Sequence, residues 1–278
     1  MIAVRTLTEL AAQRAQWPQD IGFVPTMGGL HEGHMALVRR AREAHEMVVA
    51  SVYVNPLQFG PKEDYAAYPR AEDADCRRLA QASADVVFLP TDAVIYPRGR
   101  ERHTQVRVPG LSEELCGRHR PGHFEGVTTV VARLLGLVRP RACYMGKKDY
   151  QQWRIVTRMV EDLGLPTAIV GVDTVREASG LALSTRNAYL TPAERVRAPV
   201  LYEVLTEGAQ RAAAGADLAD VEAACAERLE ASGFVPDYVA VRCAEDLAVP
   251  KATDADLVIL AAARLGRTRL IDNREFRR

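Results

Sequence analysis

The sequence carries no excess of either charge and no cysteine pattern of a disulfide or zinc protein. Lys+Arg and Asp+Glu number 36 each among 278 residues, so the formal net charge is +0. This balance gives no basic surface for nucleic acid, and we expect no nucleic-acid partner. The 5 cysteines are scattered and are never spaced as Cys-x-x-Cys. They predict reduced thiols in a cytoplasmic protein.

Long apolar runs are also missing. No stretch reaches the roughly 18 consecutive apolar residues of a membrane-spanning helix, and the N-terminal residues lack the charged and apolar regions of a signal peptide. We therefore expect no membrane partner. The remaining composition, 48% hydrophobic and 26% charged, is ordinary for a globular protein of one large or two medium domains.

Apolar runs alternate with helical patterns through about the first 175 residues. The strand-like runs are residues 21–24, 47–54, 86–89, 142–145 and 167–172. The helical patterns are residues 34–46, 72–82, 124–138 and 150–163. Near-continuous apolar strands between helices predict a Rossmann-like parallel sheet with helices on both faces. Ligands of such sheets bind beyond the carboxyl ends of the strands.

The pattern changes after about residue 175. Two alanine-rich helices are predicted at residues 191–214 and 218–232, and strands at residues 237–243, 257–263 and 268–271. Residues 264–267 are predicted to form a hairpin turn between the last two strands. The fold class is therefore α/β, a Rossmann-like parallel-sheet domain (1–175) followed by a smaller α+β C-terminal domain (176–278).

A glycine-rich segment, Pro-Thr-Met-Gly-Gly-Leu-His-Glu-Gly-His at residues 25–34, lies between the first predicted strand and helix. This arrangement directs backbone N–H groups and a helix N-terminus at an anion. The glycine spacing fits neither a P-loop nor the dinucleotide fingerprint. His31 and His34 stand where the anion is expected, and His-x-Gly-His suggests nucleotidyl transfer. A zinc site and buried structural histidines remain alternatives, although no other His or Cys has zinc-ligand spacing nearby.

Two neutral amides follow the second predicted strand. Asn55 and Gln58 can direct donors and acceptors at a small polar substrate. The alternative is turn chemistry, because Asn-Pro commonly begins a turn. That alternative explains Asn55 but leaves Gln58 unexplained.

The fourth predicted strand is followed by Met-Gly-Lys-Lys-Asp-Tyr-Gln-Gln and a helix. Gly146 permits a tight turn, and Asp149 is placed to cap the helix or approach a metal. A lysine here, Lys147 or Lys148, is a mobile cation suited to phosphate oxygens. Gln152 lies on the first helical turn and could face the same crevice. A solvated lysine pair is the alternative, although helix starts favour acidic residues.

The predicted domain boundary carries hydroxyls and a permanent cation. Ser184, Thr185 and Arg186 lie in a loop that begins at Val175 and ends at Asn187. A loop at a domain boundary can close over a bound nucleotide. Simple helix capping is the alternative.

These four motifs, in this order, resemble the pantothenate synthetase (pantoate–β-alanine ligase) family of the His-x-Gly-His nucleotidyltransferase superfamily. The resemblance extends to Arg-Leu-Gly-Arg-Thr-Arg-Leu-Ile-Asp-Asn near the C-terminus, so it covers nearly the whole chain. It implies ATP-dependent condensation of (R)-pantoate with β-alanine to pantothenate through a pantoyl adenylate, with release of AMP and pyrophosphate. It also implies Mg²⁺, a homodimer and a C-terminal lid.

The resemblance implies roles for individual residues. His34, His31, Lys148 and Arg186 are the implied catalytic residues. Gln58 and Gln152 correspond to pantoate-binding glutamines, and Gln58 also lies near β-alanine. The side chains that hold Mg²⁺ stay unassigned. The implied ATP-binding residues are Met27, Gly28, Gly29, Leu30, His31, Glu32, Gly33, His34, Gly146, Lys147, Lys148, Asp149, Val175, Leu183, Ser184, Thr185 and Arg186.

Three positions depart from the family pattern. Lys147 stands where an acidic residue is usual, Thr185 replaces the commoner serine, and Gly29 replaces a common alanine. None of these changes removes a required functional group, so we expect activity to be retained.

The alternatives to this function belong to two other classes. One is a different nucleotidyltransferase of the same fold, of the cytidylyltransferase or phosphopantetheine adenylyltransferase type, which would not need both Gln58 and Gln152. The other is an ATP-binding module without turnover, which the retained His34, Lys148 and Arg186 disfavour. Measured release of AMP and pyrophosphate would exclude the ATP-binding module without turnover.

Overall fold

The computed structural model describes residues 1–61 and 63–278. They divide into two compact units, one made of Met1–Lys147 and Ile155–Asp173, the other of Lys148–Arg154 and Thr174–Arg278. The short segment Lys148–Arg154 thus groups with the C-terminal residues although it follows a strand of the first unit. The action of residues 176–278 as a lid stays a prediction. Within the described ranges, no helix has the length and apolar character needed to cross a membrane.

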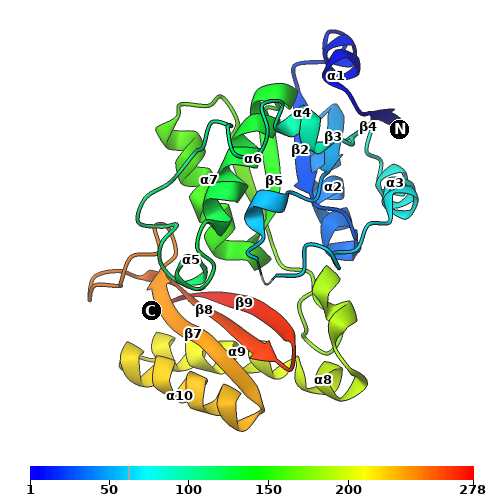
Figure 1. Cartoon of the computed structure of the whole chain (residues 1–278). Helices are drawn as coiled ribbons and strands as arrows, with labels where there is room; N and C mark the ends of the chain where they lie inside the picture. The colour runs from blue at the N-terminus through cyan, green and yellow to red at the C-terminus, as the bar shows by residue number, and fades with distance from the viewer. Residues whose placement is uncertain (62) are drawn as a thin grey trace. The chain divides into compact units, whose positions relative to one another are not determined.

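The first unit is built around a six-stranded parallel sheet (Figure 1). Its strand order is β1-β4-β3-β2-β5-β6. The strands are β1 (Ile2–Val4), β2 (Ile21–Thr26), β3 (Met47–Val52), β4 (Val86–Phe88), β5 (Ala142–Gly146) and β6 (Ala168–Val172). The predicted parallel sheet is confirmed. The sequence analysis missed β1, which is too short to show a pattern of its own.

Helices follow the strands as the alternation predicts. They are α1 (Leu7–Arg14), α2 (Glu32–Ala44), α3 (Glu72–Gln81), α4 (Asp92–Ile95), α5 (Cys116–His119), α6 (His123–Val138) and α7 (Tyr150–Asp162). In α2, Met35, Val38 and Ala41 are buried against Val24 and Ala50 of the sheet. This apolar face fixes the start of α2, and with it the His-x-Gly-His turn, over β2 and β3.

The order of the strands reverses beside β2. Strands β3 and β4 lie on one side of β2, whereas β5 and β6 lie on the other. Open parallel sheets bind ligands at the carboxyl ends of strands where the order reverses. The chain leaves β2 after Thr26 into the glycine-rich turn, and it leaves β5 after Gly146 into Lys147. The topology therefore brings the beginnings of these two motifs to one edge of the sheet.

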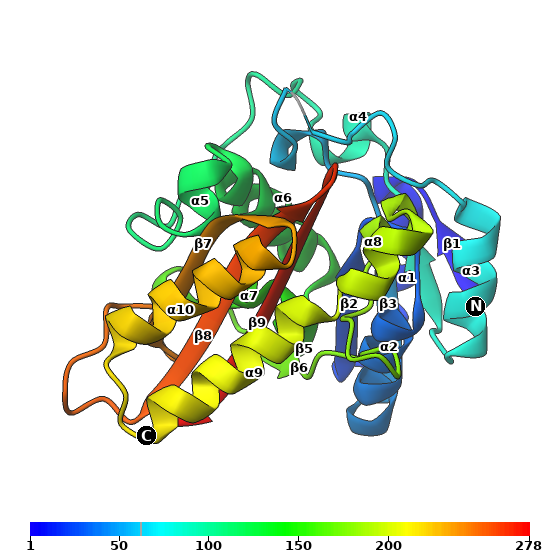
Figure 2. The same cartoon turned by 90° about the horizontal axis from the view of Figure 1, so that it is seen from below.

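The second unit has a three-stranded antiparallel sheet in the order β7-β8-β9. Its elements are α8 (Pro192–Arg197), α9 (Val200–Ala213), α10 (Leu218–Ala231), β7 (Phe234–Cys243), β8 (Asp256–Leu265) and β9 (Thr268–Arg277). Figure 2 shows α9 and α10 side by side along this sheet. Leu265 pairs with Thr268, which leaves Gly266 (φ +56°) and Arg267 as the two-residue turn between β8 and β9. The predicted hairpin is confirmed.

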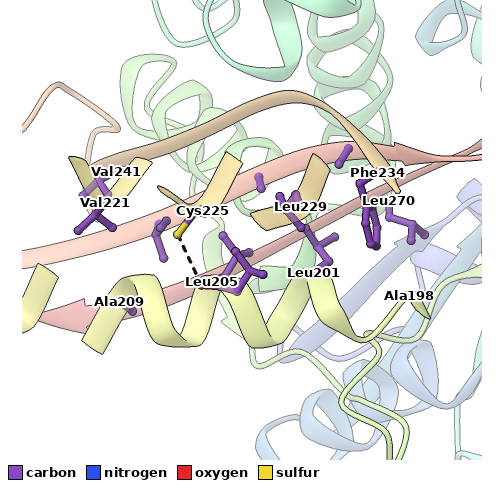
Figure 3. Close-up of a cluster of buried hydrophobic side chains, with 14 of the residues drawn as sticks. Ala198, Leu201, Leu205, Ala209, Val221, Cys225, Leu229, Phe234, Val241 and Leu270 are labelled. Carbon is purple, nitrogen blue, oxygen red and sulfur yellow. Dashed lines mark hydrogen bonds between the residues drawn. The ribbon is translucent and has the colours of Figure 1, made fainter. Parts of the chain in front are cut away.

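The core of the second unit lies between the helix pair and the sheet (Figure 3). Leu205 of α9 and Leu229 of α10 are both 0% exposed. Burying such a leucine stabilises a fold by about 1.5–3 kcal/mol. A Cβ on Gly208 would lie 2.6 Å from Cys225 Sγ, so the glycine permits the close approach of α9 to α10.

One predicted helix is wrong in extent. Residues 191–214 form α8 and α9 with a break at Pro199, not a single helix. Proline has no N–H to donate and its ring clashes with the preceding turn, so the first helix cannot continue through it. Thr191 caps α8 as a capping box with Glu194, and Pro199 begins α9.

Candidate active site

Two backbone N–H groups of the glycine-rich turn do not face an anion site as expected, because they donate to a side chain of the protein. Gly29 N donates to Asp75 Oδ2 at 2.9 Å, and Leu30 N donates to Asp75 Oδ1 at 2.8 Å. Asp75 lies on α3 and is 2% exposed. A carboxylate of the protein itself therefore accepts from two of the N–H groups that were expected to face a bound anion. Buried N–H groups need acceptors, and a buried carboxylate needs donors, so each satisfies the other.

Asp75 was not predicted as a site residue, although its position in the sequence carries a signal. Asp75 is four residues before Leu79, and both are buried on α3. An acidic residue on the buried face of a helix needs a partner. Nothing in the sequence identified that partner as a turn more than forty residues away.

The glycines of this turn are required by its backbone. Gly28 has φ +85° and Gly29 has φ +61°, in the left-handed region that favours glycine. A Cβ on Gly28 would also lie 3.0 Å from Asp75 Oδ2. The glycine at position 29 therefore suits the observed conformation better than an alanine would.

His31 and His34 form a capping box at the start of α2. Gly33 N donates to His31 Nδ1 at 3.2 Å, and His31 N donates to His34 Nδ1 at 3.2 Å. The ring centroids are 4.1 Å apart. An Nδ1 atom that accepts an N–H is unprotonated, so each neutral ring carries its proton on Nε2. The alternative of structural histidines is thus partly right, because both side chains cap a helix. Each ring also carries an N–H group, at Nε2, on its other edge.

Asn55 and Gln58 are both buried. Asn55 precedes the 3-10 turn Pro56–Gln58 (η1), and Gln58 is its last residue. Asn55 Nδ2 donates to Gln58 Oε1 at 3.2 Å and to Gly126 O at 3.0 Å, while Asn55 Oδ1 accepts from Tyr96 OH at 2.7 Å. Leu57 N also donates to Asn55 Oδ1 at 3.3 Å, so Asn55 caps this turn as the turn alternative expects. Gln58 Nε2 lies 2.8 Å from Met27 Sδ, which joins two of the predicted motifs.

A half-buried ion pair lies beside the backbone of Gln58. Arg120 Nε and Nη2 each lie 2.6 Å from a carboxylate oxygen of Glu63, and His123 Nδ1 lies 2.7 Å from Gln58 O. Burial would raise the pKa of Glu63, but the hydrogen bonds and charge of Arg120 outweigh it and the pKa is lowered. No pattern in the sequence indicated this cluster, because its residues lie far apart in the chain.

A cavity of about 360 Å³ opens at the carboxyl ends of β2 and β3. Its walls include Met27 and Gly28 of the turn, Tyr53 after β3, and Asp75. This part of the predicted ATP segment therefore borders a space large enough for a small ligand.

The two lysines after β5 have different neighbours. Lys147 Nζ lies 3.1 Å from Asp173 Oδ1, whereas Lys148 Nζ lies 3.8 Å from Asp149 Oδ2. Asp173 follows β6, so the unusual positive charge of Lys147 is balanced by the neighbouring strand of the first unit. Lys147–Asp149 forms a single 3-10 turn (η2) rather than part of the helix.

In the second unit, the loop from Val175 to Arg186 is closed by its own backbone. Leu183 N donates to Val175 O at 3.0 Å, and Ser184 Oγ accepts from Arg186 N at 3.3 Å. Ser184 thereby caps the 3-10 helix Thr185–Tyr189 (η3), as the capping alternative expects. Gln152 is half-buried on the first turn of α7.

The predicted site residues fall into two sets. Met27–His34, Gln58, Gly146 and Lys147 belong to the first unit. The second unit holds Lys148, Asp149, Gln152, Val175 and Leu183–Arg186. Over residues 1–61 and 63–278, no group of three or more His, Cys, Asp or Glu side chains could hold a metal ion.

A parallel sheet with a His-x-Gly-His turn beside its reversal point defines a Rossmann-like nucleotide-binding class. Within that class, residues 2–275 match the family model described as pantoate-beta-alanine ligase, and the chain belongs to that family. Pantothenate synthetase of Methylococcus capsulatus is 51% identical over 277 residues, covering 98% of this chain and 97% of the relative.

Solved structures agree with this assignment. The crystal structure of pantothenate synthetase from Thermus thermophilus has a TM-score of 0.92 and 49% identity, and covers 99% of each chain. Pantoate-beta-alanine ligase from Francisella tularensis, complexed with beta-gamma ATP and beta-alanine, has a TM-score of 0.82 and 33% identity. It covers 99% of this chain and 97% of its own.

Proposed function

We propose that the chain catalyses the ATP-dependent condensation of (R)-pantoate with β-alanine to pantothenate. The reaction passes through a pantoyl adenylate and releases pyrophosphate and then AMP. Family membership over nearly the whole chain supports this activity. The observation that carries the mechanism is the histidine capping box, which gives two rings a defined Nε2–H donor at the start of α2.

In the first step the pantoate carboxylate attacks the α-phosphorus of ATP. A carboxylate–phosphorus bond forms, the bond to the bridging oxygen breaks, and pyrophosphate leaves with the electron pair. Both reactants are anions, so opposing their charge is the main catalytic task. His31 and His34 donate from Nε2 to phosphate oxygens, and the cations of Lys148 and Arg186 are suited to the same oxygens.

The glycine-rich turn has fewer backbone N–H groups for ATP than its motif suggests. Gly29 and Leu30 give their N–H groups to Asp75, so contacts of these residues with ATP use other atoms. Met27 and Gly28 border the cavity and are better placed for van der Waals contact.

Mg²⁺ enters this proposal as part of the substrate. Magnesium is commonly held by one or two carboxylates together with substrate phosphates, and needs no cage of protein ligands. Asp149 is the acidic residue that suits this ion among the predicted ATP contacts after β5.

Gln58 and Gln152 are proposed to orient pantoate. A neutral amide positions a carboxylate or hydroxyl without forming an ion pair that would lower the nucleophilicity of the carboxylate. The Gln58 side chain is already fixed by Asn55. In the second step the uncharged amine of β-alanine attacks the acyl carbon of the adenylate: the C–N bond forms, the acyl C–O bond breaks, AMP leaves with the electron pair, and the surplus amine proton passes to solvent. Gln58 also contacts β-alanine in this proposal.

Isotope exchange tests the order of these steps. With enzyme, Mg²⁺ and pantoate, labelled pyrophosphate should exchange into ATP without β-alanine, because the adenylate forms first. Exchange without any acid would indicate an adenylylated enzyme, and exchange that requires β-alanine would indicate a concerted route. Either result overturns the mechanism. Activity with CTP in place of ATP, or with phosphopantetheine in place of pantoate, would favour another nucleotidyltransferase.

A binding comparison tests the glutamines separately. Gln152→Ala should weaken pantoate much more than ATP in direct titrations, because its amide is assigned to the acid. Equal losses for both ligands would contradict that assignment.

The assembly and the location of the chain remain predictions. We propose a homodimer in the cytoplasm, as the family resemblance implies. Sedimentation equilibrium of the full chain should give twice the mass of 30.6 kDa, and a monomer at micromolar concentration would contradict it.

A further inference from the structure

Strand β9 holds the predicted phosphate-binding loop of the second unit through a buried ion pair. Arg176 Nη1 and Nη2 lie 2.6 and 2.8 Å from the two carboxylate oxygens of Asp272. The Asp272 side chain is 3% exposed, and the Arg176 guanidinium also stacks on Tyr202 at 3.4 Å from the ring centroid. A bidentate pair fixes orientation as well as distance. Arg176 is the residue after Val175, so the pair anchors the loop that continues to Arg186.

The next residue of β9 holds a different segment. Asn273 Nδ2 donates to Lys148 O at 3.1 Å. Nearby, Tyr150 OH lies 2.9 Å from Glu275 Oε1 and donates to Ala244 O at 3.0 Å. These bonds tie the start of α7 to the C-terminal sheet, consistent with the grouping of Lys148–Arg154 in the second unit.

Successive side chains of a strand point to opposite faces, so Asp272 and Asn273 reach two segments from one short stretch of backbone. We infer that Asp272 and Asn273 are positioning residues for ATP, which set the spacing between Lys148 and the loop that carries Arg186. This inference rests on the proposed function, which assigns both cations to ATP. Neither residue touches the nucleotide in this inference, because their side chains are used within the protein.

Two nearly isosteric variants test the inference. Asn273→Asp removes the amide donor to Lys148 O, and Asp272→Asn removes the charge that pairs with Arg176. The matched control is Asp237→Asn, which breaks the ion pair between Arg269 Nε of β9 and Asp237 Oδ2 of β7 (2.7 Å). The Arg269 side chain is 15% exposed, close to the 17% of Arg176, whereas Asp237 at 16% is less buried than Asp272 at 3%.

We expect each test variant to raise the KM for ATP about tenfold, the equivalent of one lost hydrogen bond. The KM for β-alanine should match that of the Asp237→Asn control. Asn273→Gln, which keeps an amide donor, should recover part of the ATP affinity. A merely structural role would instead change the KM for ATP and the KM for β-alanine together.

Calorimetric ATP titration of the same proteins separates this inference from the proposed function. A wild-type chain that binds ATP but shows no pantoate-dependent exchange would contradict the proposed function. The Kd values of the variants for ATP would still test the positioning roles of Asp272 and Asn273. Unchanged ATP affinity in folded Asp272→Asn and Asn273→Asp would overturn the inference. A wild-type chain that fails to bind ATP would overturn both.

Discussion

The carboxylate of Asp75 should control the local stability of the glycine-rich turn. Asn at this position has nearly the same shape but only one acceptor oxygen. Either Gly29 N or Leu30 N would then face an NH₂ group and lose its acceptor. A hydrogen bond to a charged group contributes about 1.5–3 kcal/mol, and an unsatisfied buried donor costs about 1–3 kcal/mol. We therefore expect Asp75→Asn to lower the free energy of local opening by about 3 kcal/mol.

Amide hydrogen exchange measures this opening directly, because the amides exchange from locally open states. A change of about 3 kcal/mol corresponds to exchange on the order of 100-fold faster at Gly29 and Leu30. The control is Asp73→Asn, an exposed acidic residue in the first turn of the same helix. It should cost about 0.5 kcal/mol through the helix dipole and leave the turn protected. Equal exchange in the two variants would refute the role of Asp75.

Three further predictions concern the site. His34→Asn keeps an acceptor at the Nδ1 position but loses the Nε2–H, so helix content should be retained while turnover falls on the order of 100-fold; normal turnover would remove His34 from the mechanism. Gly126→Ala places a Cβ 2.4 Å from Leu57 O, so η1 must shift, and titration should show weaker pantoate binding through Gln58 with ATP binding preserved. Arg186→Ala should lower ATP affinity far more than Thr185→Ser, which keeps the hydroxyl; equal losses in calorimetry would mean that the loop acts through packing.

Periodicity in the sequence was sufficient for the larger elements of the fold. The apolar face of α6 and the strands β2, β3 and β5 follow directly from the alternation of residue types. The order of the strands did not, since it depends on which strands pair across the sheet. The break at Pro199 was visible in the sequence, but the alanine-rich pattern on both sides favoured one helix.

The site was predictable as a set of motifs, and less so as a set of contacts. His31, His34 and Gln58 stood out because their spacing and position after strands are unusual for loops. The distant partners of these motifs did not, because Asp75 reaches the backbone of Gly29 and Arg120 reaches that of Gln58 through the fold rather than along the chain. Local sequence patterns describe neighbours along the backbone, whereas buried polar groups are satisfied by whatever the tertiary structure brings near.

In the histidine capping box, the two nitrogens of each imidazole have different functions. The edge that carries Nδ1 accepts from the backbone, and the edge that carries Nε2 holds the proton. Lysine and arginine can only donate, and an ionised carboxylate can only accept, so none of them can replace these rings at both edges. Asparagine and glutamine have both functions, but on adjacent atoms of one amide group rather than across a rigid ring. Two constraints therefore act on His31 and His34, one from the helix that they start and the other from the proposed contact with the phosphates.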